Sequence, residues 1–219
     1  MALWQVSKSR TFQFFGVIVP HVSTSEKVIA LTFDDGPTTS GTNEILKVLD
    51  EMNVKATFFV IGAELEQNMI EGRKIVAAGH ELGNHSYSHD RMILVTPSFV
   101  QQEIEKTDRL IREVGYSKEI NFRPPFGKKL LALPYYLSKH GRKTIMWDVE
   151  PDSLPEIARD SGKIIQETRS KVRPGSIILL HAMYPSRQPS LKAVRGMIES
   201  LKQDGYRFVT ISELLAAAH

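Results

Sequence analysis

The stretch LTFDDGPT, residues 31–38, indicates both a strand and a chemical problem at its end. A run of strand formers, Val28–Phe33, leads directly into two adjacent aspartates, Asp34 and Asp35, which a Gly-Pro pair follows. Two carboxylates this close resist joint ionisation unless a cation or a basic side chain lies nearby. We therefore expect the rest of the chain to supply that positive partner.

Composition and charge are those of an ordinary globular protein. Of the 219 residues, 42% are hydrophobic and 24% are charged. The net charge is +3, but basic and acidic residues are interleaved, so we expect no nucleic-acid partner. No stretch reaches the roughly 20 apolar residues of a transmembrane helix, so we expect no stable membrane insertion. Because cysteine is absent, any metal must be held by histidine and carboxylate side chains.

The first part of the chain, residues 1–27, forms an extension ahead of the first clear strand. Lys8 and Arg10 precede a short apolar run, which faintly resembles a signal peptide. The run contains Gln13 and lacks a clear small-residue cleavage site, so we expect Phe12–Val19 to form an extra strand instead.

Apolar runs of strand length alternate with stretches of helical period along the rest of the chain. We predict strands at Val28–Phe33, Ala56–Ile61, His80–Gly83, Ile120–Phe122, Thr144–Val149, Ser176–Leu180 and Arg207–Ile211. We predict helices at Asn43–Met52, Met69–Ala78, Pro97–Val114, Leu130–Lys139, Pro155–Val172, Ser190–Asp204 and Ser212–Ala218. Repeated βα units imply a parallel sheet, as a barrel or a doubly wound layer, with an active site at the carboxyl ends of the strands.

Reactive side chains follow five of the predicted strands. In chain order they are Asp34 and Asp35, His85 and His89, Arg123, then Asp148, Glu150 and Asp152, and finally His181. Carboxyl ends of parallel strands meet at one edge, so we expect these groups to converge on one mouth of the sheet.

The sequence NHSYSH, residues 84–89, suggests a metal site. Histidines four residues apart lie on one face of a helical turn, so His85 and His89 can reach one ion, although an isolated pair of this kind is more often two surface histidines. With one aspartate they make a three-ligand site that leaves a position for water, as in catalytic zinc sites. Side chains diverge at a strand end, so one of Asp34 and Asp35 can bind the metal while the other faces the water. The alternative for the two aspartates is a turn and helix-cap pair.

Two further basic residues are candidates for catalytic work. Arg123 could orient a carboxylate and lower its pKa, or it could cap a sheet end at the surface. His181 ends a buried strand and could protonate a leaving group, although a lone histidine in this position is more often structural. The N–H of Phe126 or Gly127 is a candidate donor to an oxyanion.

Apolar walls of the cleft are the last candidates. Trp147 could present its ring to a sugar, and Leu180 could line the same cleft, although core packing is the stronger alternative for Leu180.

Five motifs in this order resemble those of the polysaccharide deacetylases, the NodB-homology carbohydrate esterases. They are TFDDG at 32–36, HSYSH at 85–89, RPPF at 123–126, WDVEPDS at 147–153 and LLH at 179–181. The resemblance spans roughly residues 28–215 and implies one catalytic domain over residues 1–219. It also implies a distorted (β/α) barrel with about seven parallel strands.

The resemblance assigns a role to each matching residue. Asp34 would be the general base, oriented by Arg123, and His181 the general acid. The metal, Zn²⁺ or another divalent ion such as Co²⁺ or Ni²⁺, would be held by Asp35, His85 and His89. The substrate would contact Pro125, Phe126, Trp147 and Leu180. Phe126 stands where many members have tyrosine, and the fourth motif lacks the Asp-Trp pair of many members. Both Glu150 and Asp152 therefore remain candidates for tuning His181.

The resemblance also implies an activity. Members remove acetyl groups from N-acetylglucosamine in chitin, peptidoglycan or related polymers, and release acetate. The alternatives are a deacetylase of another substrate, such as O-acetylxylan or a lipid-linked sugar, and a catalytically silent sugar-binding barrel. Because such polymers lie in the bacterial cell envelope, the resemblance favours a protein outside the cell or associated with its envelope.

Overall fold

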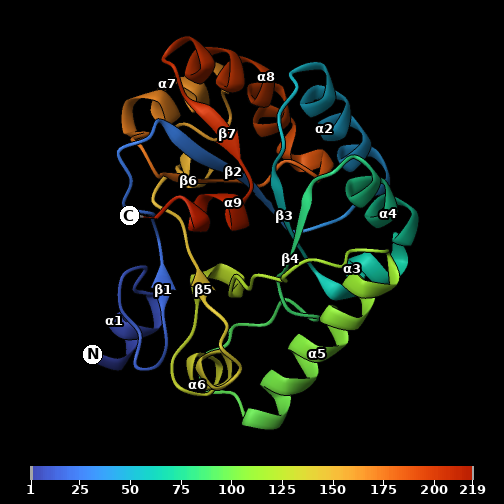
Figure 1. Ribbon diagram of the computed structural model, residues 1–219, viewed down its shortest axis with the longest axis vertical. Coiled ribbons are helices and arrows are strands. Elements are labelled where there is room, and N and C mark those ends of the chain that lie inside the picture. The colour runs from blue at the N-terminus through green and yellow to red at the C-terminus, as the bar shows by residue number, and fades with distance from the viewer. Residues whose placement is uncertain (1, 219) are drawn as a thin grey trace.

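A computed structural model describes residues 2–218 as an α/β fold built on parallel strands (Figure 1). The strands are β1 (Ile18–Val19), β2 (Val28–Asp34), β3 (Thr57–Val60), β4 (Glu81–Asn84), β5 (Thr144–Ile145), β6 (Ile177–Leu180) and β7 (Arg207–Val209). The α-helices are α1 (Ala2–Lys8), α2 (Thr39–Glu51), α3 (Gly62–Gln67), α4 (Met69–Ala77), α5 (Pro97–Glu113), α6 (Ala132–Lys139), α7 (Ser161–Lys171), α8 (Gln188–Gln203) and α9 (Ile211–Ala216). Short 3-10 helices are η1 (Pro125–Gly127), η2 (Pro151–Ser153) and η3 (Pro185–Arg187).

The central strand is β2, and all seven of its residues are buried. The strand order is β4-β3-β2-β6, with β7 paired to the first part of β2, and every pair is parallel. Burial on both faces explains why β2 is a nearly continuous apolar run. Phe33 lies opposite Phe58 of β3 and Leu180 of β6, so these strands end at one level and direct the residues that follow to one edge.

The sheet is open between its two edge strands, β4 and β6, and isolated bridges between single residues span this gap. Phe122 pairs with Asn84 on one side and Thr144 on the other, and Val149 pairs with Ile178. The predicted distorted barrel of parallel strands is therefore confirmed, with its weakest part between β4 and β6.

Two predicted strands are wrong in extent for identifiable reasons. Ile120–Phe122 is reduced to the isolated pairs of Phe122, because two prolines follow at once after Arg123 and cannot donate to a ladder. Thr144–Val149 forms a strand only over β5, since the Asp148 carboxylate accepts the Ile177 N–H that would otherwise join the ladder.

Other predicted boundaries also shift. Of Phe12–Val19 only β1 is a strand, and it pairs with β5. The helix predicted over Pro155–Val172 begins at Ser161, because the Asp160 side chain caps it by accepting from the N–H groups of the next turn. Helices α1 and α3 were not predicted.

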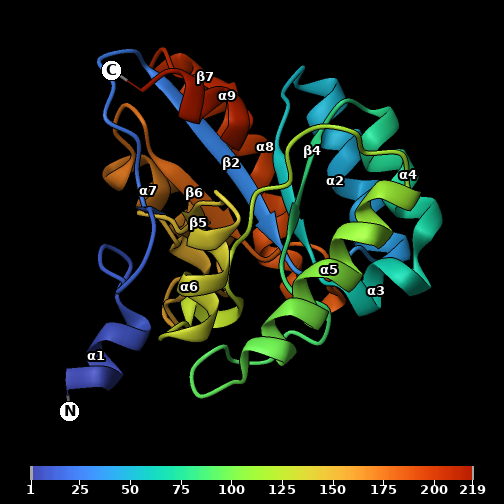
Figure 2. The same cartoon turned by 60° about the horizontal axis from the view of Figure 1, so that its bottom comes forward.

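The helices cover the sheet in two groups. Figure 1 shows α2, α3, α4 and α5 along the side of β3 and β4, and α7 with α8 near β6 and β7. The largest core cluster lies between these helices and the sheet and includes Phe33, Phe58 and Leu180. Turned by 60°, the molecule shows α1 apart from the first group, on the side of β5 and α6 (Figure 2). None of the helices within residues 2–218 combines the length and the apolar character that a membrane span requires.

Candidate active site

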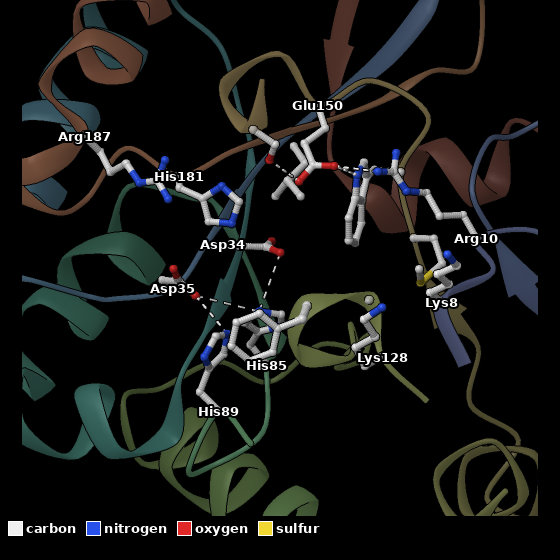
Figure 3. Close-up of a pocket in the computed structure, with 16 residues that line it drawn as sticks. Lys8, Arg10, Asp34, Asp35, His85, His89, Lys128, Glu150, His181 and Arg187 are labelled. Atoms are coloured by element: carbon white, nitrogen blue, oxygen red, sulfur yellow. Dashed lines mark hydrogen bonds and ion pairs between the residues drawn. The ribbon is translucent and has the colours of Figure 1, made fainter. Parts of the chain in front are cut away.

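All but one of the predicted reactive residues meet in or directly beneath one cavity of about 520 Å³ at the carboxyl ends of the strands. The exception is Asp148, whose carboxylate accepts from the Ser176 hydroxyl and the Ile177 N–H at the start of β6, so the prediction that it joins the site is wrong. Asp34 ends β2, His85 directly follows β4, and His181 directly follows β6. The lining includes Asp34, Asp35, His85, His89, Phe126, Trp147, Glu150 and His181 (Figure 3). Arg123 lies directly beneath, fully buried.

Asp35, His85 and His89 form a group that can hold a metal ion, since one ligand atom from each lies within 4.8 Å of the others. His89 Nε2 is 3.3 Å and His85 Nε2 is 3.8 Å from Asp35 Oδ1 (Figure 3). Asp35 Oδ1 is buried and accepts no hydrogen bond from any described residue. An orphaned carboxylate oxygen facing two imidazole nitrogens fits a divalent cation well.

The protonation of His85 suits a metal ligand. Its Nδ1 lies 2.8 Å from the Arg123 carbonyl, which can only accept, so Nδ1 carries the proton and Nε2 has a free lone pair. Burial, assisted by His89, lowers the pKa of His85 to about 3. The ring is therefore neutral at physiological pH, as metal binding requires.

The histidine pair is not on a helical turn as predicted, but in a loop with unusual backbone geometry. Ser86 and His89 have positive φ of 65° and 62°, and across the site Asp35 has 75° and Phe126 has 56°. Such values are uncommon outside glycine and cluster at functional sites, where the surroundings impose them.

Glu103 of α5 imposes this loop conformation. Its carboxylate accepts from the N–H groups of Tyr87 and Ser88 at 2.9 and 2.7 Å, and from the Ser88 hydroxyl. Asn84 accepts from the Ser86 N–H, and Ser86 Oγ accepts from the His89 N–H. The sequence analysis missed Glu103, because a glutamate on a helix has no local signal that it serves a loop 15 residues away.

Asp34 lies beside this group and belongs to a second set of contacts. Arg123 Nη1 donates to Asp34 Oδ1 at 2.5 Å, and Asp34 Oδ2 is 3.6 Å from His85 Nε2. Burial raises the pKa of Asp34 above its ordinary value, although the charges of Arg123 and His181 oppose this. A raised pKa makes the carboxylate a stronger proton acceptor.

On the other side of Asp34, His181 is paired with Asp152. Its backbone N–H donates to Asp152 Oδ2 at 2.7 Å, and its Nδ1 is 3.5 Å from Asp152 Oδ1. Burial disfavours the charged ring, but the hydrogen bond and charge of Asp152, with Asp34 and Asp35, outweigh it and raise the pKa of His181 to about 9. His181 is thus protonated at neutral pH.

Glu150, the other candidate partner of His181, points elsewhere. It accepts from Trp147 Nε1 at 2.7 Å and from Arg10 at 2.6 Å, and it also binds Ser153. Glu150 therefore holds the tryptophan and the N-terminal extension, and Asp152 is the acid that contacts His181.

The apolar walls differ from expectation at two positions, Leu180 and Pro125. Phe126 is 53% exposed, with its ring centroid 4.6 Å from that of His89, and Trp147 also lines the cavity. Leu180 is fully buried in the core, whereas its neighbour Leu179 lines the cavity, because side chains alternate between the two faces of a strand. Pro125 is also buried and does not line the cavity.

The loop after Arg123 offers one backbone donor. The Gly127 N–H donates to the Pro124 carbonyl, and the Lys128 N–H to the Pro125 carbonyl. Within residues 2–218 the Phe126 N–H has no backbone acceptor, so of the two predicted oxyanion donors it is the one without a competing backbone bond.

Four basic residues at the cavity were not predicted: Lys8, Arg10, Lys128 and Arg187. They come from the N-terminal extension, the loop after η1 and the end of η3. No local sequence pattern marks them as residues of a cavity.

Comparison with known proteins agrees with this geometry. The profile of the family named polysaccharide deacetylase matches residues 21–145. A peptidoglycan-N-acetylglucosamine deacetylase of Bacillus cereus is 30% identical over 204 residues, covering 93% of this chain and 95% of that protein. The crystal structure of a peptidoglycan N-acetylglucosamine deacetylase in complex with a benzamide compound has a TM-score of 0.84 at 30% identity, covering 91% and 92% of the chains.

A further similar structure contains a metal. A family 4 acetyl xylan esterase from Clostridium thermocellum, in complex with a cobalt ion, has a TM-score of 0.78 at 33% identity, covering 86% of this chain and 90% of that one. The family profile covers more than half of the chain, and the relatives are similar over nearly all of it. The Asp-His-His group of the cavity lies within the residues that the profile matches. The chain belongs to the polysaccharide deacetylase family.

Proposed function

We propose that this protein is a metal-dependent hydrolase that removes N-acetyl groups from N-acetylglucosamine in a glycan of the peptidoglycan or chitooligosaccharide type. The observation that carries the proposal is the Asp35, His85 and His89 group with Asp34 on one side and a protonated His181 beyond it. The names of the similar proteins support the substrate class.

Zinc is the proposed metal, with cobalt or nickel as substitutes. One carboxylate and two neutral imidazoles are the ligands that catalytic zinc sites use, and Asp35, His85 and His89 would hold the ion. When bound, the metal would polarise the acetamide carbonyl and increase the acidity of a water molecule.

The chain's own residues perform the proton transfers. Asp34, oriented by Arg123, accepts a proton as water attacks the acetamide carbonyl carbon. The Phe126 N–H is available to the developing oxyanion. His181, held by Asp152, then gives its proton to the amine nitrogen as the carbon–nitrogen bond breaks, and acetate and a free amine leave.

Acetate release from N-acetylglucosamine oligomers tests the proposal. Metal-stripped protein should be inactive, and added zinc or cobalt should restore release. The Asp34→Asn variant should bind metal yet lose turnover by about 10³-fold or more. Asp50→Asn is the matched control, because Asp50 is exposed on α2, away from the cavity. Absence of release from the native protein with every metal would refute the proposal.

A second substrate class has its own support. The similarity to an acetyl xylan esterase favours O-acetylated xylan as the alternative. Acetate release from xylan, with none from N-acetylglucosamine oligomers or peptidoglycan, would select it.

We also propose that the protein works in the bacterial cell envelope, because peptidoglycan lies there. Fractionation of cells that produce the protein should recover it outside the cytoplasm, and recovery with cytoplasmic enzymes alone would refute this location.

A further inference from the structure

Three cations meet at one rim of the cavity. Lys8 and Lys128 line it, and Figure 3 shows the two on the same side, across the cavity from His181. Arg91 lies with its guanidinium 5.0 Å from the ring centroid of Phe126, which also lines the cavity. We call Lys8, Arg91 and Lys128 the cationic rim.

Within residues 2–218 none of these three has a carboxylate oxygen within 4.0 Å, not even that of Asp90, the neighbour of Arg91. Burial lowers the pKa of Lys128, and the charges of Lys8 and Arg91 lower it further. The cationic rim therefore consists of like charges that repel one another and lack a counter-charge from the described chain.

The acidic residues of the cavity do not neutralise the cationic rim, because each of them has another partner. Asp34 is bound by Arg123, and Glu150 by Arg10. Asp35 faces His85 and His89. A counter-charge for the cationic rim therefore comes from outside the described chain, from solvent ions or from a bound anion.

Strong contacts hold the rim together despite the repulsion. The Lys129 N–H donates to the Ser7 carbonyl at 3.1 Å, and the Lys129 ammonium donates to the Ser9 carbonyl. Lys129 is only 1% exposed, so the two residues that flank Lys8 are fixed by a buried clamp next to Lys128. The Trp4 ring, 4.7 Å from Lys128 Nζ, adds a further contact to α1. The backbone segments that carry Lys8 and Lys128 are therefore held next to each other by the fold.

The cationic rim adjoins the reaction centre. Phe126 connects them, with Arg91 on its ring and His89 at a centroid distance of 4.6 Å. An anionic group bound there belongs to the sugar that reacts or to its neighbour along the strand.

We propose that the cationic rim binds a carboxylate carried by the glycan, so that the preferred substrate is an acidic strand rather than a neutral N-acetylglucosamine oligomer. The inference rests on the proposed function and narrows its substrate class. The carboxylate comes from an acid substituent on a sugar or from an acidic peptide attached to one, and both present the same group to Lys8, Arg91 and Lys128.

Direct binding tests this inference without turnover. Zinc-loaded Asp34→Asn protein would be titrated in a calorimeter with three strands of equal length. One is a neutral N-acetylglucosamine oligomer, one contains carboxylate-bearing sugars, and one carries acidic peptides on those sugars. We expect tighter binding of the acidic strands, with a preference that shrinks as NaCl rises from about 50 to about 500 mM.

Charge variants in the same background assign the preference to the cationic rim. Lys8→Gln or Lys128→Met should each lower the ratio of acidic to neutral affinity about two- to fivefold, and the double variant about tenfold. Lys128→Arg keeps the charge and should keep the ratio. Lys139→Gln, an exposed lysine at the end of α6, is the matched control and should also keep it.

Equal affinity for neutral and acidic strands would overturn the inference, as would a preference that survives the double variant. Tighter binding of the peptide-bearing strand than of the bare acidic strand would identify the peptide as the source of the carboxylate, and equal binding would identify the sugar. Acetate release from the same strands by the native zinc-loaded protein is measured separately. If no strand releases acetate, the proposed function fails whatever the binding shows; release without an acidic preference refutes the inference alone.

Discussion

Arg123 Nη1 lies 2.5 Å from Asp34 Oδ1, and neither side chain is more than 3% exposed to solvent. The same guanidinium donates through Nη1 to the Thr32 hydroxyl and through Nη2 to the Met146 carbonyl, whereas its Nε has no partner among the described residues. The pair thus holds the carboxylate in one orientation next to the metal-binding group, in surroundings that raise its pKa.

Breaking this pair should cost more than removing both charges. Arg123→Met leaves the Asp34 charge buried without a partner, which should lower the free energy of unfolding by about 3–5 kcal/mol. Adding Asp34→Asn removes that charge and should recover most of the loss. Urea unfolding of both variants measures this, with Arg109→Met on the exposed face of α5 as the control. The interpretation would be contradicted if the double variant lost as much stability as Arg123→Met and Asp34→Asn lose separately, added together.

The His181–Asp152 pair predicts the alkaline limb of the pH–rate profile. His181 must be protonated to act as an acid, and its pKa is raised to about 9. Activity should therefore fall as pH rises through about 9. In Asp152→Asn, burial is no longer outweighed by this partner, so the limb should move to lower pH. Glu150→Gln serves as the control, because Glu150 does not contact His181 and should leave the limb in place.

The same pair predicts how stability depends on pH. The folded pKa of His181, about 9, exceeds the ordinary value of 6.5, so the folded state binds the proton more tightly. The resulting stability is fully present below pH 6.5 and is lost as pH rises through about 9. The difference in unfolding free energy between the native protein and Asp152→Asn should shrink over this range. If this difference stays constant between about pH 6 and about pH 10, the stability of the pair does not depend on the protonation of His181.

Glu103 should control metal affinity without touching the metal. Glu103→Ala removes the acceptor for two loop N–H groups and should weaken metal binding by about 10- to 100-fold. Competition with a chelator measures the affinity. Gln102→Ala, exposed on the same helix, is the control. Unchanged affinity in Glu103→Ala would show that the loop keeps its conformation without this carboxylate.

Lys129 should anchor the N-terminal segment. Lys129→Met removes a buried ammonium that binds the Ser9 carbonyl, so amide hydrogen exchange in residues 2–10 should become about tenfold faster. Lys139→Met, exposed on α6, should leave exchange in this segment unchanged. Equal exchange in the native protein and Lys129→Met would contradict the anchoring role.

Local sequence determined the strands that carry the site and the residues at their ends. An apolar run that stops at Asp34 indicates a buried strand followed by a polar edge, and the run before His181 follows the same logic. Gly79 and Gly115, which directly follow two of the predicted helices, have the positive φ that helix C-caps require. These features depend on near neighbours along the chain, so the sequence alone sufficed.

Only the tertiary structure decided which side chains meet. Asp152, not Glu150, contacts His181, because the chain enters η2 at Pro151 and turns the two carboxylates in different directions. Leu179, not Leu180, faces the cavity, because neighbouring side chains of a strand point to opposite faces. The meeting of Lys8 with Lys128 joins segments 120 residues apart in the chain, through the same contact that joins Lys129 to Ser9. Such proximity arises from the packing of distant elements, and no local pattern of charge or hydrophobicity encodes it.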